Sequence, residues 1–239
     1  MRNEGPITPV SIEIDEMKYR QKGESFEEKI KRIARALMDD INHKDSLEDI
    51  LGHMRFLPAG RVQSAVGSNR ITTAYNCFVS GTINDSMNKI MEKASEAAET
   101  MRRGGGIGYD FSKIRPRGDK IKSLDSQASG PVSFMGIFDS ICQTIASSGH
   151  RRGAQMGVLR IDHPDIEEFV TAKRNSDKLT GFNVSVGVTD KFMEALINDK
   201  DDSFELMFED KAYKTISANE LWNTIMESTW DWAEPGVLF

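Results

Sequence analysis

The chain has 239 residues, of which 38% are hydrophobic and 28% charged, so it can bury a sizeable core without disulfides or a structural metal. Its 31 Lys and Arg against 37 Asp and Glu give a net charge of -6, the wrong sign for a protein that coats duplex nucleic acid. No stretch approaches the roughly 18 apolar residues that span a bilayer, so we expect a cytoplasmic protein that binds neither nucleic acid nor membranes directly.

The first predicted elements are helices. A capping box opens an amphipathic helix expected over residues 26–40, and a shorter helix follows at 47–54. Pro58 then breaks the helical pattern. We therefore expect a helical N-terminal region over residues 1–55 and a second domain over residues 56–239.

In the second domain, segments with strand composition alternate with helical ones. Thr, Tyr, Phe and Val predict a strand over 71–83, which contains Cys77, and Asn84, Asp85 and Ser86 cap the helix that follows. Such alternation predicts a mostly parallel sheet buried on both faces, because each crossover lays a helix against it. The later expected elements are a helix at 135–145, a strand at 156–161, a helix after Pro164, a strand at 182–188, a helix capped by Asp190, a helix at 221–232 and a strand beginning at Val237.

The glycine-rich run at 104–108 has two interpretations. In a dinucleotide-binding fold such a run follows a strand and opens a helix, whereas here a helix ends at Arg103 and a strand is expected next. The run is either a helix stop with close backbone packing or a backbone that must approach a ligand closely.

Two basic segments could bind an anion. Arg151 and Arg152 stand between glycines, and Arg115 and Lys122 belong to a second basic loop. Guanidinium forks on such loops suit phosphate oxygens, but arginines after a helix also occur simply because they offset its dipole. Both interpretations stay open at this point.

The two cysteines, Cys77 and Cys142, are too few for a disulfide framework and lack zinc-ligand spacing. The four histidines are scattered, so we expect no protein-bound metal. A lone cysteine in a strand or on an apolar helix face is more often a small buried residue than a reactive group.

A series of short motifs follows in order along the chain: Phe56–Arg61, Tyr75–Val79, Gly104–Ser112, Ile114–Gly118, Ala128–Met135, Arg151–Ala154, Asp162–Glu167, Phe182–Val186 and Ala233–Val237. Taken together, these motifs resemble the large subunit of ribonucleotide reductases over nearly the whole chain. The Pro58–Arg61 form, the triple glycine and the doubled arginine resemble the adenosylcobalamin-dependent class more than the class with a separate iron subunit.

The resemblance implies an α/β fold: a helical N-terminal region followed by the first half of a ten-stranded α/β barrel. It also implies reduction of ribonucleotides to deoxyribonucleotides by a thiyl radical, with adenosylcobalamin, a thioredoxin-like reductant and a homodimer. In the family the finger loop with the radical cysteine lies beyond the position of Phe239. We therefore expect this chain to require the C-terminal half of the catalytic subunit and to reduce no nucleotide alone.

The same resemblance assigns roles to single residues. Cys77 matches the first member of the cysteine pair that delivers two electrons. The positions that would line the ribonucleotide substrate are Asn76, Cys77, Gly106, Arg151 and Arg152. The positions that match a deoxynucleotide effector site at the dimer interface are Asp85, Ser86, Arg115 and Lys122.

Three alternative functions compete with this one. A glycyl-radical enzyme uses a related barrel but lacks these motifs. The large subunit of an iron-dependent reductase shares most of them. A non-catalytic nucleotide-binding regulatory module would keep only the effector site, and nucleotide binding without turnover would favour it.

Overall fold

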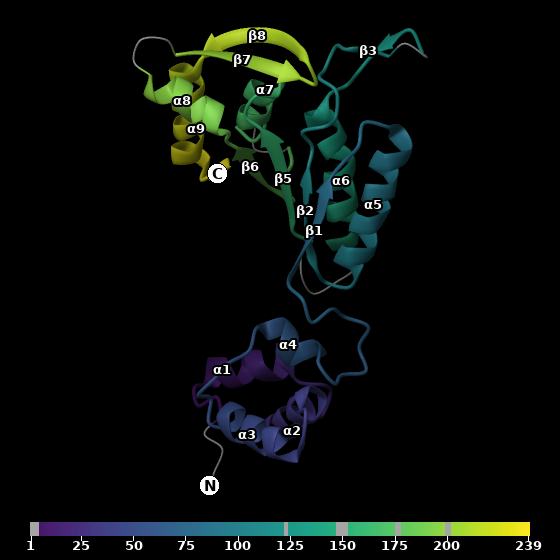
Figure 1. Cartoon of the computed structure of the whole chain (residues 1–239). Coiled ribbons are helices and arrows are strands. Elements are labelled where there is room, and N and C mark those ends of the chain that lie inside the picture. The colour runs from purple at the N-terminus through teal and green to yellow at the C-terminus, as the bar shows by residue number, and fades with distance from the viewer. Residues whose placement is uncertain (1–4, 122–123, 147–152, 175–177, 199–201) are drawn as a thin grey trace. The chain divides into compact units, whose positions relative to one another are not determined.

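The chain forms two compact units, Met1–Asn76 and Cys77–Phe239. The structure is a computed structural model that describes residues 5–121, 124–146, 153–174, 178–198 and 202–239 (Figure 1). The first unit extends past the boundary predicted at residue 56, because α4 (Gly60–Ala65) packs within it. A Cβ atom at Gly60 would lie 2.9 Å from the Tyr19 ring.

The described part of the first unit is helical. Its α2 begins at the predicted capping box, where the hydroxyl of Ser25 accepts from the Glu28 amide at 3.2 Å and the Glu28 carboxylate accepts from the Ser25 amide at 2.8 Å. Ile30 and Ile33 of α2 pack with Leu51 in a small apolar core. The helices are α1 (Pro9–Ile14), the π-helix η1 (Asp15–Tyr19), α2 (Phe26–Leu37), α3 (Ile41–Gly52) and α4.

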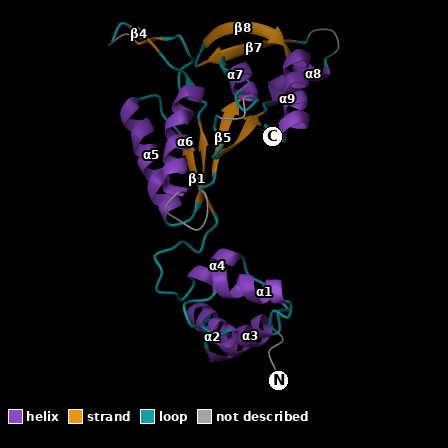
Figure 2. Cartoon of the chain, turned by 180° about the vertical axis from the view of Figure 1, so that it is seen from behind, coloured by secondary structure: helices purple, strands orange, loops and turns teal. Residues whose placement is uncertain are grey.

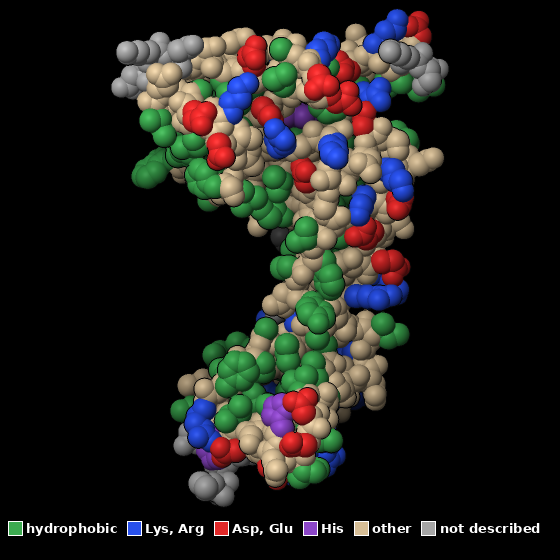
Figure 3. Space-filling model, in the orientation of Figure 1, with side chains coloured by type: hydrophobic (Ala, Val, Ile, Leu, Met, Phe, Trp, Pro, Cys, Tyr) green, Lys and Arg blue, Asp and Glu red, His purple; other side chains and the backbone are tan. Residues whose placement is uncertain are grey.

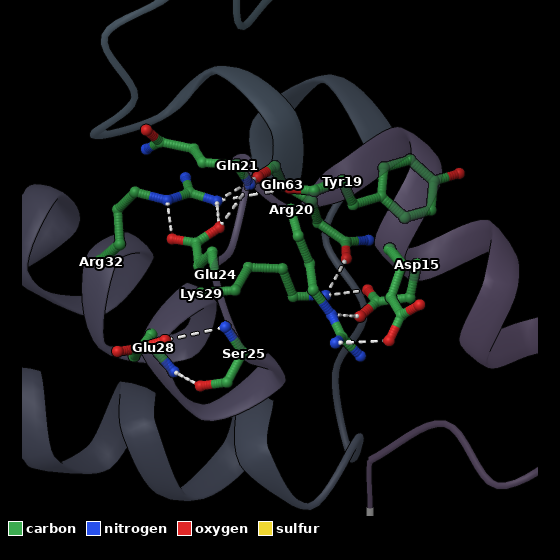
Figure 4. A network of polar contacts seen from close by, with 11 residues as sticks. Asp15, Tyr19, Arg20, Gln21, Glu24, Ser25, Glu28, Lys29, Arg32 and Gln63 are labelled. Carbon is green, nitrogen blue, oxygen red and sulfur yellow. Dashed lines mark hydrogen bonds and ion pairs between the residues drawn. The ribbon is translucent and has the colours of Figure 1, made fainter.

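A buried ion-pair network joins η1 to α2 (Figure 4). Lys29 is 2% exposed and donates to the Asp15 carboxylate, which also accepts from Arg20 Nε at 2.5 Å. Lys29 Nζ also donates to Gln63 Oε1 of α4 at 3.2 Å. An unpaired buried charge is strongly destabilising, so these side chains hold the elements of this unit together.

A five-stranded parallel sheet forms the centre of the second unit, in the order β1-β2-β5-β6-β9 (Figure 1). Each strand that comes later in the sequence pairs with the previous one on the side away from β1. Because crossovers between parallel strands are right-handed in nearly all proteins, a sheet that grows in one direction carries its crossover helices on one face, as half of a barrel does. The strands are β1 (Cys77–Thr82), β2 (Gly106–Asp110), β5 (Gln155–Arg160), β6 (Phe182–Gly187) and β9 (Gly236–Leu238).

Burial along the strands differs from the predicted sheet with two covered faces. In β2, Ile107 and Tyr109 are buried, whereas Gly106, Gly108 and Asp110 are partly exposed, and β5 alternates in the same way until its end. The helices therefore cover one face and leave an open face opposite. The helices of this unit, seen from behind in Figure 2, are α5 (Met87–Arg102), α6 (Pro131–Ala146), α7 (Ile166–Thr171), α8 (Asp190–Ile197) and α9 (Ala218–Trp232).

The covered face carries the main apolar core, with one polar bridge inside it. The Tyr109 ring lies 4.9 Å from that of Phe138, centroid to centroid. The Tyr109 hydroxyl donates to Gln155 Oε1 at 3.0 Å, and Gln155 Nε2 donates to the Phe138 carbonyl at 2.9 Å. Burial raises the pKa of Tyr109, so the hydroxyl stays protonated and satisfies the buried amide.

Among the described residues, two antiparallel hairpins lie outside the sheet and were not predicted. They are β3 (Lys120–Ile121) with β4 (Ser126–Gln127), and β7 (Ser203–Phe208) with β8 (Lys211–Ser217). Two predicted details are also corrected. The strand expected over 71–83 begins only at Cys77, and α8 is capped by the Thr189 hydroxyl, one residue before Asp190.

Candidate functional site

Cys77 is the first residue of β1, and its side chain lies on the open face. In the pairing of β1 with β2, Cys77 lies beside Gly106 and Phe78 beside Ile107. Paired residues of adjacent strands point to the same face, and Ile107 is buried beneath the helices. Cys77 therefore points away from the helices, and its thiol is exposed. A buried, purely apolar role for this cysteine does not agree with that exposure.

The residues identified on the open face near Cys77 are uncharged. Gly106 has no side chain, so the surface beside the thiol stays accessible. Asn183 presents an exposed side chain on this face. It was not among the predicted site residues, although a polar residue between the apolar Phe182 and Val184 was a visible signal. Further along the strands a row of paired residues crosses the face: Val79, Gly108, Met156 and Asn183.

The other predicted substrate residues are close in the sequence to strands that form this face. Asn76 directly precedes Cys77 and is the last residue of the first unit. Arg151 and Arg152 lie outside the described residues. The segment after them enters β5 beside β2, because the Ala154 carbonyl accepts from the Ile107 amide at 3.1 Å.

Cys142 is buried, whereas Cys77 is exposed. Cys142 is 2% exposed on the inner face of α6, as predicted. Cβ atoms added at Gly153 or Gly181 would lie 2.8 Å from its sulfur. Burial raises the pKa of the Cys142 thiol, and a protonated, enclosed thiol is a poor nucleophile and reductant.

The predicted effector residues lie at the other end of the strands. Asp85 follows β1 and Arg115 follows β2. Arg115 Nε donates to Asp85 Oδ2 at 2.6 Å, and the Arg115 amide donates to Asp85 Oδ1 at 3.3 Å. Ser86 caps α5, accepting from the Lys89 amide at 3.3 Å. Three of the four predicted residues thus lie together, and Lys122 lies outside the described residues.

Asp85 and Arg115 line a cleft of about 850 Å³, within the size range of small-molecule sites. The opposite wall is the turn of the β7–β8 hairpin, with Lys211 and Tyr213. The Tyr213 hydroxyl donates to Asp119 Oδ2 at 2.6 Å, and burial together with this bond raises the pKa of Tyr213 to about 12. Acidic and basic side chains are mixed over the face that carries this hairpin (Figure 3).

Neither a metal centre nor a membrane span is found in the part of the chain that the structure describes. Its His, Cys, Asp and Glu side chains nowhere gather in threes around a possible ion position. Within the same residues, each helix is too short or too polar to cross a bilayer.

The second unit, called the barrel-like unit below, also matches a known protein family. The model of the ribonucleotide reductase barrel domain matches residues 75–239, which includes the whole described sheet and both candidate sites. This chain belongs to the ribonucleotide reductase family. The predicted family and the predicted parallel α/β fold are thereby confirmed.

Named ribonucleotide reductases are similar over most of the chain. The vitamin B12-dependent ribonucleoside-diphosphate reductase of Thermoplasma acidophilum is 40% identical over 195 residues, which cover 80% of this chain and 25% of that protein. The enzyme of the same name from Mycobacterium tuberculosis is 39% identical over 191 residues, covering 80% and 27%. The chain thus spans about a quarter of the length of these curated relatives.

A solved ribonucleotide reductase has the same fold. The class Id α subunit from Actinobacillus ureae superposes with a TM-score of 0.77 at 21% identity, covering 97% of this chain and 40% of that chain. At this identity the likeness concerns the fold alone. It agrees with the one-directional strand order of the sheet.

Proposed function

We propose that this chain is the N-terminal part of a ribonucleotide reductase catalytic subunit, an enzyme that reduces ribonucleotides to deoxyribonucleotides for DNA synthesis. The observation that carries the proposal is the exposed Cys77 thiol on the open face of the sheet, beside Gly106. The open face of a half-barrel becomes the interior of a closed barrel. Cys77 then faces the cavity in which a ribonucleotide binds.

In the proposed reaction the 2′ hydroxyl of the ribonucleotide leaves as water, and the 2′ carbon gains a hydrogen. Two thiols supply the two electrons and become one disulfide. Cys77 is one of these thiols, and a cysteine elsewhere in the catalytic subunit is the other. A third cysteine, as a thiyl radical, removes and returns the 3′ hydrogen, and a thioredoxin-like dithiol reduces the disulfide again.

Substrate binding is assigned to residues around this thiol. Gly106 permits the ribose to approach the backbone, because a glycine puts no side chain in its way. Asn76 offers an amide for ribose hydroxyls. Arg151 and Arg152 supply guanidinium groups for the phosphates.

We propose adenosylcobalamin as the radical initiator, because relatives that are 40% and 39% identical carry vitamin B12 in their names. When bound, this cofactor would supply the radical chemistry that generates the thiyl radical. The roles proposed for the residues around Cys77 concern the nucleotide, and none of these residues is assigned to the cofactor.

The cleft at Asp85 and Arg115 is proposed as the site of a deoxynucleotide effector, with Ser86 and Lys122 as further contacts. Arg115 provides a charge-assisted donor for phosphate oxygens. The site is completed by a second copy of the subunit, in a homodimer that uses the N-terminal ends of α5 and α6. The binding site is therefore regulatory and separate from the thiol.

The sheet has two edges at which the rest of a barrel can pair. Among the described residues, β1 and β9 each have one neighbouring strand, and Val79 of β1 is 92% exposed. Open edges of this kind are normally covered. We assign their cover to the C-terminal half of the catalytic subunit, in the cytoplasm, where thiols stay reduced.

The test uses the completed enzyme, meaning this chain together with the rest of the catalytic subunit. Cys77→Ser is expected to bind ribonucleotide with unchanged affinity and to lose multiple-turnover reduction, because a serine hydroxyl cannot deliver electrons. Cys142→Ser is the matched control and is expected to keep turnover. A competing function, a regulatory module that only binds nucleotide in the Asp85–Arg115 cleft, requires that Cys77→Ser change nothing.

A further inference from the structure

His163 is a buried histidine that none of the proposed chemistry uses. It is 2% exposed. Its Nδ1 accepts from the Asp165 amide at 3.0 Å, and its Nε2 lies 2.9 Å from the Ile114 carbonyl oxygen. A carbonyl can only accept, so Nε2 carries the proton and the ring is neutral. Burial also lowers the pKa of His163, which favours the same neutral form.

The Nε2 bond connects the segment before α7 to the loop that carries Arg115, whereas the Nδ1 bond is local to the His163–Asp165 turn. Ile114 directly precedes Arg115 and is held by the histidine. Arg117, two residues further on, donates its amide to Asp165 Oδ2 at 2.9 Å. Arg115 is therefore flanked on both sides by backbone contacts to the His163–Asp165 segment.

The opposite wall of the effector cleft contacts the same histidine. The ring of Phe208, which lines the cleft, packs edge-on against the His163 ring with centroids 5.7 Å apart. The Met207 amide donates to the Asp162 carbonyl at 2.6 Å. Both walls of the cleft thus meet at His163.

We propose that His163 is a positioning residue of the effector cleft: through its Nε2 bond to Ile114 it fixes the Arg115 loop at the distance from β7 that a nucleotide requires. This inference rests on the proposed effector site. It assigns to the Asp162–Glu167 motif a role in nucleotide affinity rather than in turnover.

Two substitutions each remove one of the two hydrogen bonds of the imidazole and keep the other. In His163→Asn the amide oxygen can still accept from the Asp165 amide, as in an Asx turn, but the side chain is too short to reach Ile114. In His163→Gln the longer side chain places its amide nitrogen near the position of Nε2 and keeps the bond to Ile114. Each variant loses one buried hydrogen bond, so their unfolding midpoints should fall by similar amounts.

The experiment measures the Kd of dATP and dTTP for the completed enzyme by equilibrium dialysis. His163→Asn is expected to raise the effector Kd on the order of tenfold, the effect of losing one well-placed hydrogen bond, while His163→Gln stays within about threefold of wild type. The amides of Ile114, Arg115, Arg117 and Gly118 are expected to exchange with deuterium faster in the Asn variant. His53→Asn and His53→Gln, in the first unit, serve as controls.

The outcomes separate this inference from the proposed function. Equal Kd values for the Asn and Gln variants, or no change in either, overturn the positioning role of His163 if Arg115→Ala still weakens binding. An unchanged Kd in Arg115→Ala itself overturns the effector site, and the role of His163 fails with it.

Discussion

Replacing Arg115 by alanine is the most informative change at the proposed effector site. The side chains of Arg115 and Asp85 are 35% and 27% exposed, and Nε lies 2.6 Å from Oδ2. A pair with this much solvent contact contributes up to about 1 kcal/mol to the free energy of unfolding. The second bond, from the Arg115 amide to Asp85 Oδ1, uses only the backbone of Arg115 and remains in the alanine variant. The loop should therefore keep its course.

The effect on effector affinity should be larger than the effect on stability. A charge-assisted hydrogen bond to a phosphate contributes about 1.5–3 kcal/mol, so its loss should raise the effector Kd roughly tenfold to a hundredfold. The assay is calorimetric titration of the completed enzyme with dATP and dTTP, together with urea unfolding. Substrate preference should lose its dependence on the effector.

A matched control is Arg55→Ala, which removes an exposed arginine that is paired with Asp49 in the first unit. It should leave the effector Kd unchanged. If Arg115→Ala keeps both affinity and effector-dependent substrate preference, the assignment of the cleft is wrong. A loss of several kcal/mol in unfolding free energy would instead mean that Arg115 serves the fold.

Three further predictions concern the barrel-like unit. Cys142→Ser should lower the free energy of unfolding by about 1–3 kcal/mol because it buries a hydroxyl. Cys77→Ser, at an exposed position, should change the same free energy by less than about 0.5 kcal/mol. Equal losses of the two variants in urea unfolding would refute the difference in burial. Tyr109→Phe should cost about 1–3 kcal/mol because Gln155 Oε1 loses its buried donor, and an unchanged thermal midpoint would contradict that bond. The lowered pKa of His163 means that the unfolded chain binds more protons below pH 6.5, so stability should fall as the pH drops from 6.5, and His163→Gln should reduce this dependence.

Local patterns in the sequence were enough to predict most elements of the sheet and its helices. The apolar spacing from Met87 to Met101 predicts α5, and the glycine run after it ends that helix and leads into β2. The capping box at Ser25 begins α2, and the Ser217 hydroxyl caps α9. Each of these signals depends on neighbours within a few residues, so a single sequence contains them.

Long-range pairing was not predictable from the same patterns. That Cys77 faces away from the helices follows only from its register beside Gly106. The β7–β8 hairpin was missed because β7 alternates over only a few residues and β8 has no buried position that would give it an apolar pattern. His163 shows no local signal for its bond to Ile114, 49 positions away, although the motif around it was recognised.

The role of Cys77 is tested most directly by trapping thiols after a single turnover. The completed, fully reduced enzyme is mixed with one equivalent of ribonucleotide and no external reductant, quenched with an alkylating agent and digested for mass spectrometry. The proposed mechanism predicts one disulfide per deoxynucleotide formed, joining Cys77 to a cysteine outside this chain, while Cys142 remains a free thiol. Formation of deoxynucleotide with Cys77 still fully reduced would contradict its role as an electron donor.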